Sequence, residues 1–320
     1  MRRRPHDALF RGVFGDPARA GELLRACLPR SVVGAIRWRH LRAVPGTFVD
    51  EDLREQITDL MFAAPLRHGF AHLCTVLEHR RRHARWIALR MHRYVTQHLA
   101  SWAAQHPRAR LLPPVLPLVI HQGPRPFRAP SALSQLIDRR GLPLQLRRHQ
   151  PELRPFVFDL QAHDLGRMGL PLFARLPLLH LQQVPDRPGT GRLLDLWRPQ
   201  LRELFAAPGG LPIFDRLVSY VNIVGVDDKR TLKHAYREIH PDAEDRFMTL
   251  GEKLLAEGRA EGRAEGEIKG QRKVLRRLLT KRFGDLPRGV TRRITAATDR
   301  DIDLWLDRLL VARTLADVVG

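Results

Sequence analysis

The sequence predicts an α/β protein in which a mixed β-sheet is followed by a helical extension and a small α-helical module. Apolar runs over residues 43–50, 57–64 and 70–79 are short and separated by turn residues, which is typical of strands. Residues 84–105 instead carry apolar side chains at helical spacing, and another short apolar run covers 115–120. A helix that leads from one strand to a later one favours parallel pairing. The predicted order is therefore helix, three strands, helix, strand.

The first helix and the hairpin are predicted from local signals. Asp16 is a favourable N-cap residue and Pro17 suits the first helical position, so a helix is expected to run from there to Pro29. The second and third apolar runs flank a short polar turn that contains Gly69, a pattern typical of a β-hairpin. The core of the fold is therefore predicted within residues 1–125.

Residues 126–250 are predicted to form a mostly helical extension packed on this core. Amphipathic helices are expected over 193–205 and 213–224, and residues 157–160 are a candidate further strand. Residues 273–320 are predicted to form a small module of three helices, the first of which ends at Gly284.

Residues 251–272 contain the repeat AEGR-AEGR-AEGE, in which glycine recurs every fourth residue. Each such glycine costs about 1 kcal/mol relative to alanine inside a helix. The segment is therefore predicted to be a weak helix or a flexible spacer. The alternative is a close helix–helix contact along the glycines, through which the chain, together with the 273–320 module, forms a homo-oligomer.

The charge of the chain favours a polyanionic partner. The formal net charge is +21 and the sequence pI is about 11.4, and nucleic acid is the commonest polyanion in cells. Codon bias in a GC-rich genome would explain why arginine replaces lysine, but it does not explain the shortage of acids. Between Leu60 and Gln150 only Glu78 and Asp138 are acidic, against fifteen arginines.

The composition also indicates the cellular compartment in which the protein is expected. Two cysteines, Cys27 and Cys74, are too few for a disulfide framework. The longest apolar run, residues 111–120, is too short to cross a bilayer, and no apolar region of a secretory signal follows the basic start. A cytoplasmic protein without membrane contact is expected.

The predicted hairpin carries the residues best suited to chemistry. Strand alternation places Glu78 and Arg80 on one face, and pairing with the preceding strand would bring Asp59 beside Glu78. Two carboxylates on adjacent strands suit a hard cation such as Mg²⁺, which polarises a phosphodiester and lowers the pKa of water. The alternative is an ordinary sheet in which Asp59 caps a turn and Glu78 pairs with an arginine.

A series of segments resembles one known family. HDALFRGVFGDPARAGELLRACLP, GTFVDEDLREQITDLMF, VLEHR, LRMHRYV and PPVLPLVIHQGPRPF follow one another in this order, and the tail contains RRLLTKRFGDLP and LWLDRLL. Together they resemble the recombination-promoting nuclease (Rpn) family of YhgA-like transposases in bacteria. The resemblance implies a restriction-endonuclease-like αβββαβ core of the PD-(D/E)XK superfamily. It also implies a DNA nuclease of mobile elements, associated with the nucleoid.

Carried over by position, the resemblance assigns Asp59 and Glu78 as ligands of Mg²⁺, and Asp59, Glu78 and Arg80 as the catalytic residues. Arg80, Arg81, Arg82 and Arg85 would contact the phosphates of DNA. His6 and Asp7 match the opening of the family and would support the site. Gly123 is expected to serve a turn that needs a positive φ.

Arg80 departs from the family pattern, which has Gln at this position and Lys in the wider superfamily. Arginine stays protonated and cannot act as a base. It can instead clamp a phosphate, or neutralise Glu78 and displace the metal. Three functions therefore stay open: a Mg²⁺-dependent DNA endonuclease, a DNA-binding protein on a reduced nuclease scaffold, and an oligomerising interaction protein.

Overall fold

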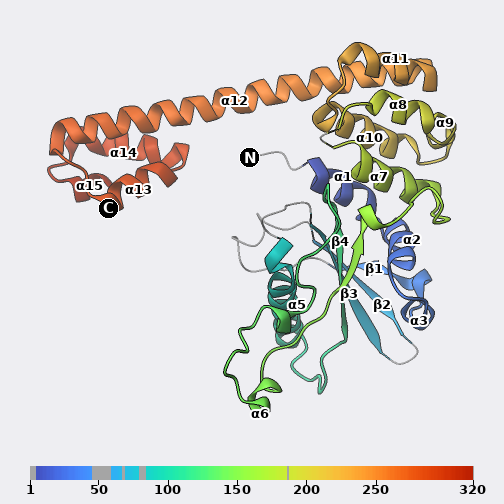
Figure 1. Cartoon of the computed structure of the whole chain (residues 1–320). Coiled ribbons are helices and arrows are strands. Elements are labelled where there is room, and N and C mark those ends of the chain that lie inside the picture. Colours follow the sequence, from blue (N-terminus) through green and yellow to red (C-terminus); the bar gives the residue numbers. More distant parts are fainter. Residues whose placement is uncertain (1–4, 45–58, 67–68, 79–83, 186, 320) are drawn as a thin grey trace. The chain divides into compact units, whose positions relative to one another are not determined.

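The computed structural model describes residues 5–44, 59–66, 69–78, 84–185 and 187–319 (Figure 1). The chain divides into two compact units, residues 2–250 and residues 251–320. We call them the α/β unit and the C-terminal unit. Within the described residues no helix is long and apolar enough to span a bilayer.

The α/β unit is built on one five-stranded mixed sheet with the strand order β1-β2-β3-β4-β5. Its strands are β1 (Arg42–Ala43), β2 (Asp59–Pro65), β3 (Phe70–Glu78), β4 (Val115–His121) and β5 (Phe156–Asp159). The first three strands pair antiparallel, and β3-β4 and β4-β5 pair parallel. This confirms the predicted hairpin, the parallel crossover and the fifth strand. The predicted strand over 43–50 is described only to residue 44, and its remainder lies outside the described residues.

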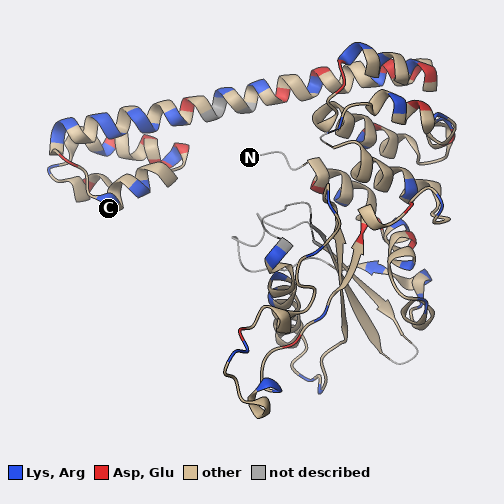
Figure 2. Ribbon diagram, viewed as in Figure 1, with Lys and Arg blue, Asp and Glu red and all other residues tan. Residues whose placement is uncertain are grey.

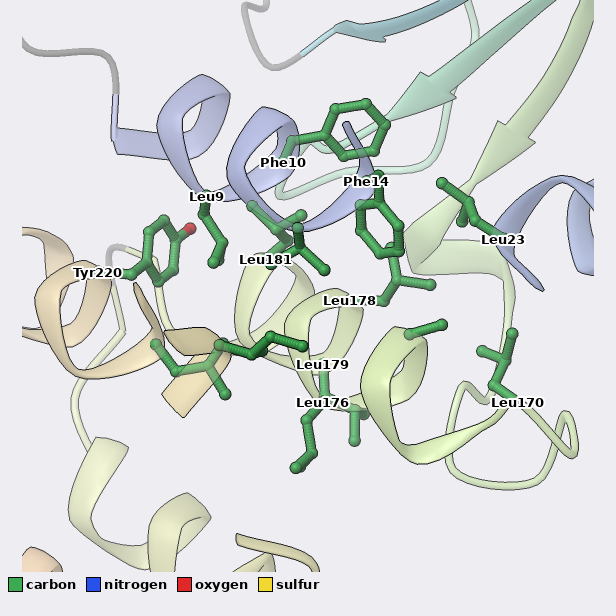
Figure 3. Close-up of a cluster of buried hydrophobic side chains, with 14 of the residues drawn as sticks. Leu9, Phe10, Phe14, Leu23, Leu170, Leu176, Leu178, Leu179, Leu181 and Tyr220 are labelled. Atoms are coloured by element: carbon green, nitrogen blue, oxygen red, sulfur yellow. The ribbon is translucent and has the colours of Figure 1, made fainter. Parts of the chain in front are cut away.

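One face of the sheet is covered by α1 (Pro5–Phe14), α2 (Pro17–Cys27) and α7 (Leu172–Gln183), with the short α3 (Arg30–Ala35) and η1 (Trp38–His40) beside them (Figure 1). The helix α10 (Leu211–Val224) packs on α1 and α7. The start of α2 is the predicted one, because the Asp16 side chain accepts a hydrogen bond from the Arg19 amide at 3.1 Å. The rings of Phe10 and Phe14 in α1 are 5.1 Å apart between centroids, and Phe14 lies beside Leu178 of α7 in the largest core (Figure 3).

The opposite face is covered by α5 (Ile87–Gln105), which follows the single turn η2 (Ala84–Trp86). Met91 and Tyr94 of this helix pack on Met61, Cys74 and Val119 of the sheet. Alternate residues of each strand therefore enter separate cores, as the period of two in a strand requires. The connection from β3 through α5 to β4 is the crossover that the sequence predicts.

The helical extension contains two helices where one was predicted over 193–205. They are α8 (Thr190–Leu196) and α9 (Arg198–Ala206), which meet at Trp197. Pro199 lacks the amide hydrogen that a continuous helix would use at that position, so the helix restarts there. Beyond them lie α10, which confirms the predicted helix 213–224, and α11 (Lys229–Ile239). The loops before α7 contain η3 (Leu133–Gln135), α6 (Leu144–Arg147) and η4 (Leu160–Ala162).

The C-terminal unit has its own core. It contains the end of α12 (Pro241–Phe283), then α13 (Arg288–Ala296), α14 (Asp299–Val311) and α15 (Leu315–Val319). Leu275, Leu279, Ile294 and Trp305 are buried together. Gly284 follows α12 at φ 81°, which confirms its predicted role as the end of that helix.

The repeat segment is helical throughout, since α12 runs through it without a break. A Cβ added at Gly258, Gly262, Gly266 or Gly270 would meet no atom within 4 Å among those the structure describes. These glycines therefore make no close helix–helix contact within the described chain.

Candidate functional site

The carboxyl ends of the parallel strands gather polar residues at one edge of the sheet. Glu78 of β3 is the register partner of His121 of β4, which in turn is the partner of Asp159 of β5. The antiparallel β2 begins at this same edge with Asp59. Ligand sites in open α/β sheets lie outside the carboxyl ends of the strands, so this edge is the candidate site.

Asp59 and Glu78, the two predicted metal ligands, occupy diagonal positions on neighbouring strands. Asp59 pairs with Val76, and Glu78 lies two residues further along β3. This register puts positions 59 and 78 on the same face of the sheet, where diagonal neighbours are about 7–8 Å apart. Their side chains lie outside the described part of the structure, and so do Arg80, Arg81 and Arg82. The roles assigned to these residues therefore stay predictions.

His121 is the described side chain that lies in register with Glu78. It is buried, with 7% of its surface exposed, and its ring packs edge-on against Phe127 at 5.2 Å between centroids. Its Nε2 donates to the carbonyl oxygen of Arg125 at 3.2 Å, and the tautomer with its proton on Nε2 leaves Nδ1 as an acceptor. Within the described residues this buried Nδ1 has no hydrogen-bond partner. It is therefore suited to accept a hydrogen bond from water or to bind a cation.

Gly123 holds the space that His121 needs. A Cβ at this position would lie 2.6 Å from Nε2 and 2.8 Å from Cε1 of His121. The expectation of a positive φ at Gly123 is wrong, because its backbone is not among the left-handed glycines. Glycine is required here by the close approach of an imidazole ring.

Asp159 anchors the loop that follows β4. Its Oδ2 accepts from the Phe127 amide at 2.6 Å, and its Oδ1 accepts from the Gln161 amide at 3.1 Å. Both carboxylate oxygens are thus engaged by backbone donors. Asp159 positions Phe127 against His121.

On the other side of the strand end, Gln122 joins the first helix to the helical extension. Its amide donates to Leu181 O at 2.8 Å and to His6 Nδ1 at 3.1 Å. The hydroxyl of Tyr220 also lies 2.8 Å from His6 Nδ1. Asp7, next to His6 in α1, is buried. The HD and HQG segments of the sequence therefore meet in space and tie α1, α7 and α10 to the end of β4.

Arg85 is the predicted phosphate contact that the structure describes. It is exposed, and its guanidinium lies over the ring of Trp86 at 5.1 Å from the centroid. A guanidinium held on an aromatic face keeps its edge free for an anion.

A second polar feature lies at the opposite end of the same sheet face. A cavity of about 260 Å³ is bordered by Arg42, His72, His98 and Trp102. His72 Nδ1 and His98 Nε2 are 2.6 Å apart. Burial, together with the nearby His98 and Arg42, lowers the pKa of His72 to about 4, and burial lowers the pKa of His98. Both rings are therefore neutral near pH 7.

The sequence of this chain matches one known family over most of its length. Residues 4–205 match the family model described as "Putative transposase, YhgA-like", which is more than half of the chain. The chain belongs to the YhgA-like transposase family. The matched range includes α1, the whole sheet and the helices up to α9.

Several curated relatives of this chain are named recombination-promoting nucleases. It is 30% identical to RpnD of Escherichia coli O157:H7 over 121 residues, which are 38% of this chain and 46% of the relative. It is also 30% identical to RpnA of Escherichia coli strain K12, over 37% of this chain and 40% of the relative. A third relative, 28% identical over 37% of this chain and 39% of its own, is named an inactive recombination-promoting nuclease-like protein, RpnE.

The YhgA-like chain thus covers less than half the length of these first relatives. No solved structure matches it.

The residues of the candidate edge fit the divalent cation that the resemblance implies. Asp59 and Glu78 offer hard oxygen donors, and the orphaned Nδ1 of His121 lies in the same register row as Glu78. Among the described side chains no three His, Cys, Asp or Glu residues form a metal site, and those of Asp59 and Glu78 are not among the side chains described. His121 is a further candidate residue at this edge that was not predicted from the sequence. The signal was its place in HQG, at the carboxyl end of an apolar strand.

Proposed function

We propose that this protein is a Mg²⁺-dependent DNA endonuclease that promotes recombination by breaking DNA. The observation that carries the proposal is the register of β2 and β3, which puts Asp59 and Glu78 on one face at the carboxyl edge of the sheet. Membership of the YhgA-like transposase family and the names of its relatives point to the same chemistry.

The proposed core is the αβββαβ unit of PD-(D/E)XK nucleases. The support is the element order α2, β1, β2, β3, α5, β4, with the β2-β3 hairpin antiparallel and β3-β4 parallel. In this proposal β5 and the helical extension are additions that brace the strand ends.

The residues have separate proposed roles. Asp59 and Glu78 hold Mg²⁺, which when bound stabilises charge on the phosphate and lowers the pKa of water. Through Nδ1, His121 orients water at this edge, and Gly123 and Asp159 keep its ring in place. Arg80, Arg81, Arg82 and Arg85 bind backbone phosphates.

A second candidate function is DNA binding on a scaffold with reduced catalysis. Two observations favour it: Arg80 stands where the family pattern has glutamine, and relatives at about the same identity are named inactive. In that case Arg80 neutralises Glu78.

The first test is nicking of supercoiled plasmid with Mg²⁺ and with EDTA. We expect nicking that EDTA abolishes, and a loss of at least about 100-fold in Asp59→Asn and in Glu78→Gln, because even outer-sphere partners of metal ligands contribute about 10–100-fold. Glu152→Gln, an exposed carboxylate in the same unit, is the matched control and should nick normally. Full activity in both site variants would refute the assignment.

Arg80→Gln separates the two candidate functions. If Arg80 is the residue that reduces catalysis in this protein, the substitution creates or raises Mg²⁺-dependent nicking. If the wild-type protein nicks and Arg80 clamps a phosphate, the substitution lowers nicking. DNA binding in both proteins, with no nicking in either, would support the binding function alone.

A further inference from the structure

The end of α12 and the helix that follows it are strongly cationic. Between Ile268 and Ala296 the only acidic residue is Asp285, against ten lysines and arginines. Residues 297–320 are instead rich in aspartate. Figure 2 shows the last turns of α12 largely in the colour of Lys and Arg. The positive charge of the C-terminal unit is therefore gathered on two helices.

Some of these cations serve the fold. Arg272 donates from Nε to the carbonyl oxygen of Ala297 at 3.1 Å. Arg282 donates to Leu309 O and to Ala312 O, the latter at 2.6 Å. Arg293 lies over the ring of Trp305. These side chains join α12 to the end of α13, and both helices to α14.

Four other cations of α12 have no such task. They are exposed, and within the described residues none has an ion pair or a side-chain hydrogen bond: Lys273, Arg276, Arg277 and Lys281. Together with Thr280 they line a surface hollow of about 480 Å³. We call these four residues the cationic stripe.

The core of the unit holds the stripe toward solvent. Leu275 and Leu279, on the other side of the same helical turns, are fully buried. Lys273, Arg277 and Lys281 recur every four residues, so they follow one another along α12 at about 6 Å intervals. Over the roughly 12 Å that this stripe covers, duplex DNA carries about seven negative charges.

We propose that the cationic stripe binds the phosphate backbone of duplex DNA, without reading its sequence. The hollow and the unpaired cations fit a polyanion. A second copy of this chain is a poorer occupant, because each copy carries a net charge of +21. The proposal adds a DNA contact to the proposed nuclease function but does not depend on cleavage, since the stripe lies in a unit with its own core.

The test measures binding of the full-length protein to a duplex of about 25 base pairs in EDTA, between about 50 and 200 mM salt. The triple variant Lys273→Gln, Arg277→Gln, Lys281→Gln removes three charges from the stripe. The matched control, Lys253→Gln, Arg259→Gln, Arg263→Gln, removes three exposed charges from an earlier part of the same helix. Thermal melts verify that both variants stay folded.

We expect the slope of log affinity against log salt concentration to become shallower by about 2.7 in the stripe variant. This value follows because each of the three lost phosphate contacts contributes about 0.9 to the slope. The control should change it by less than about 1. Equal changes in both variants would overturn the proposal, because binding would then follow net charge alone.

Two further outcomes would also overturn it. Tighter binding of a matched RNA duplex would assign the stripe to RNA. Unchanged DNA binding with a loss of dimers in sedimentation would assign it to a second copy. A wild-type protein that does not nick, yet binds DNA through the stripe, would refute the proposed nuclease function and leave this inference standing.

Discussion

The two units of the chain arrange their polar side chains in different ways. At the edge of the sheet in the α/β unit, two described polar side chains are held by specific contacts: His121 donates to the carbonyl oxygen of Arg125 beside Gly123, and Asp159 accepts from two backbone amides. In the C-terminal unit, the stripe consists of similar cations repeated along one helix. Single substitutions should therefore have large effects in the first case and graded effects in the second.

The two units should also differ in how their stability depends on pH. All fifteen histidines lie between His6 and His240, so residues 251–320 contain none. Several of these histidines are buried, His180 completely. Lowering the pH through the range in which histidine titrates should therefore destabilise the α/β unit more than the C-terminal unit.

The largest effect is expected from Leu279→Ala, which tests whether the two units are independent. Leu279 is fully buried in the core of the C-terminal unit, and such a truncation costs about 2–5 kcal/mol. Calorimetry should show the C-terminal unit melting earlier while the α/β unit and plasmid nicking are unchanged. Leu278→Ala, at a position that is 39% exposed, is the control with a small effect. A parallel loss of stability in both units would show that they do not unfold independently.

The next effect is the acid sensitivity of the α/β unit. Burial lowers the pKa of His180 from 6.5 to about 4, so the unfolded chain binds this proton more readily than the folded chain. The stabilisation is present above pH 6.5 and is lost as pH falls from 6.5 toward 4, by at most about 3 kcal/mol for one such histidine. His72, whose pKa is lowered to about 4, adds to the same window.

His180→Phe keeps a ring beside Trp197 and removes the titrating group. Melting temperatures of the α/β unit should then depend less on pH between 6.5 and 4. The C-terminal unit, without histidine, should show little change over the upper half of this range. An identical pH dependence in the variant would contradict the role given to His180.

A smaller loss of stability is expected from Gly123→Ala, about 1–3 kcal/mol in the free energy of unfolding, because the added methyl group overlaps the buried ring of His121. Nicking should fall with it, since the ring must shift. Gly34→Ala is the control in the same unit: Gly34 lies in α3 with no atom within 4 Å of an added Cβ, so stability should hold or rise. Normal stability and nicking in Gly123→Ala would remove the argument for a fixed His121.

The smallest effect is a gain. Gly258→Ala and Gly262→Ala should each stabilise α12 by up to about 1 kcal/mol, because an added Cβ meets open space. Helicity by circular dichroism should rise accordingly. If the substitutions instead dissociate a dimer in sedimentation experiments, the glycines form an intermolecular contact.

The sequence predicted those parts of the fold in which a local signal and the tertiary structure agree. The cap at Asp16, the hairpin around Gly69 and the helix end at Gly284 each depend on one residue and its neighbours. The α8–α9 break was missed because the apolar spacing continues through Trp197, while Pro199 interrupts the hydrogen bonds.

The strand register of the candidate site was partly readable. Alternation along β3 and one hairpin were enough to predict that Asp59 and Glu78 come from neighbouring strands. The part played by His121 was not readable, because it depends on β4 pairing with β3 and on the loop that Asp159 anchors. Gly123 was misread for the same reason: a contact with a ring two residues away leaves no conformational signature in the sequence.

In the long helix α12, local propensity predicted less order than the structure has. The low helix propensity of the repeated glycines favoured a weak helix or a flexible spacer, whereas α12 is continuous. Its alanines, glutamates and arginines are strong helix formers. Phe247, before the repeat, and Leu275, after it, are also each buried in a core. Tertiary packing at both ends explains a helix that local propensity alone would leave marginal.

The proposed metal site is tested without cleavage by Mn²⁺ binding to the full-length protein, followed by electron paramagnetic resonance. We expect one tight site in the wild-type protein that is lost in Asp59→Asn and, separately, in Glu78→Gln, and that is kept in Glu152→Gln. A site that both substitutions leave intact would contradict the claim that these two positions share one divalent ion.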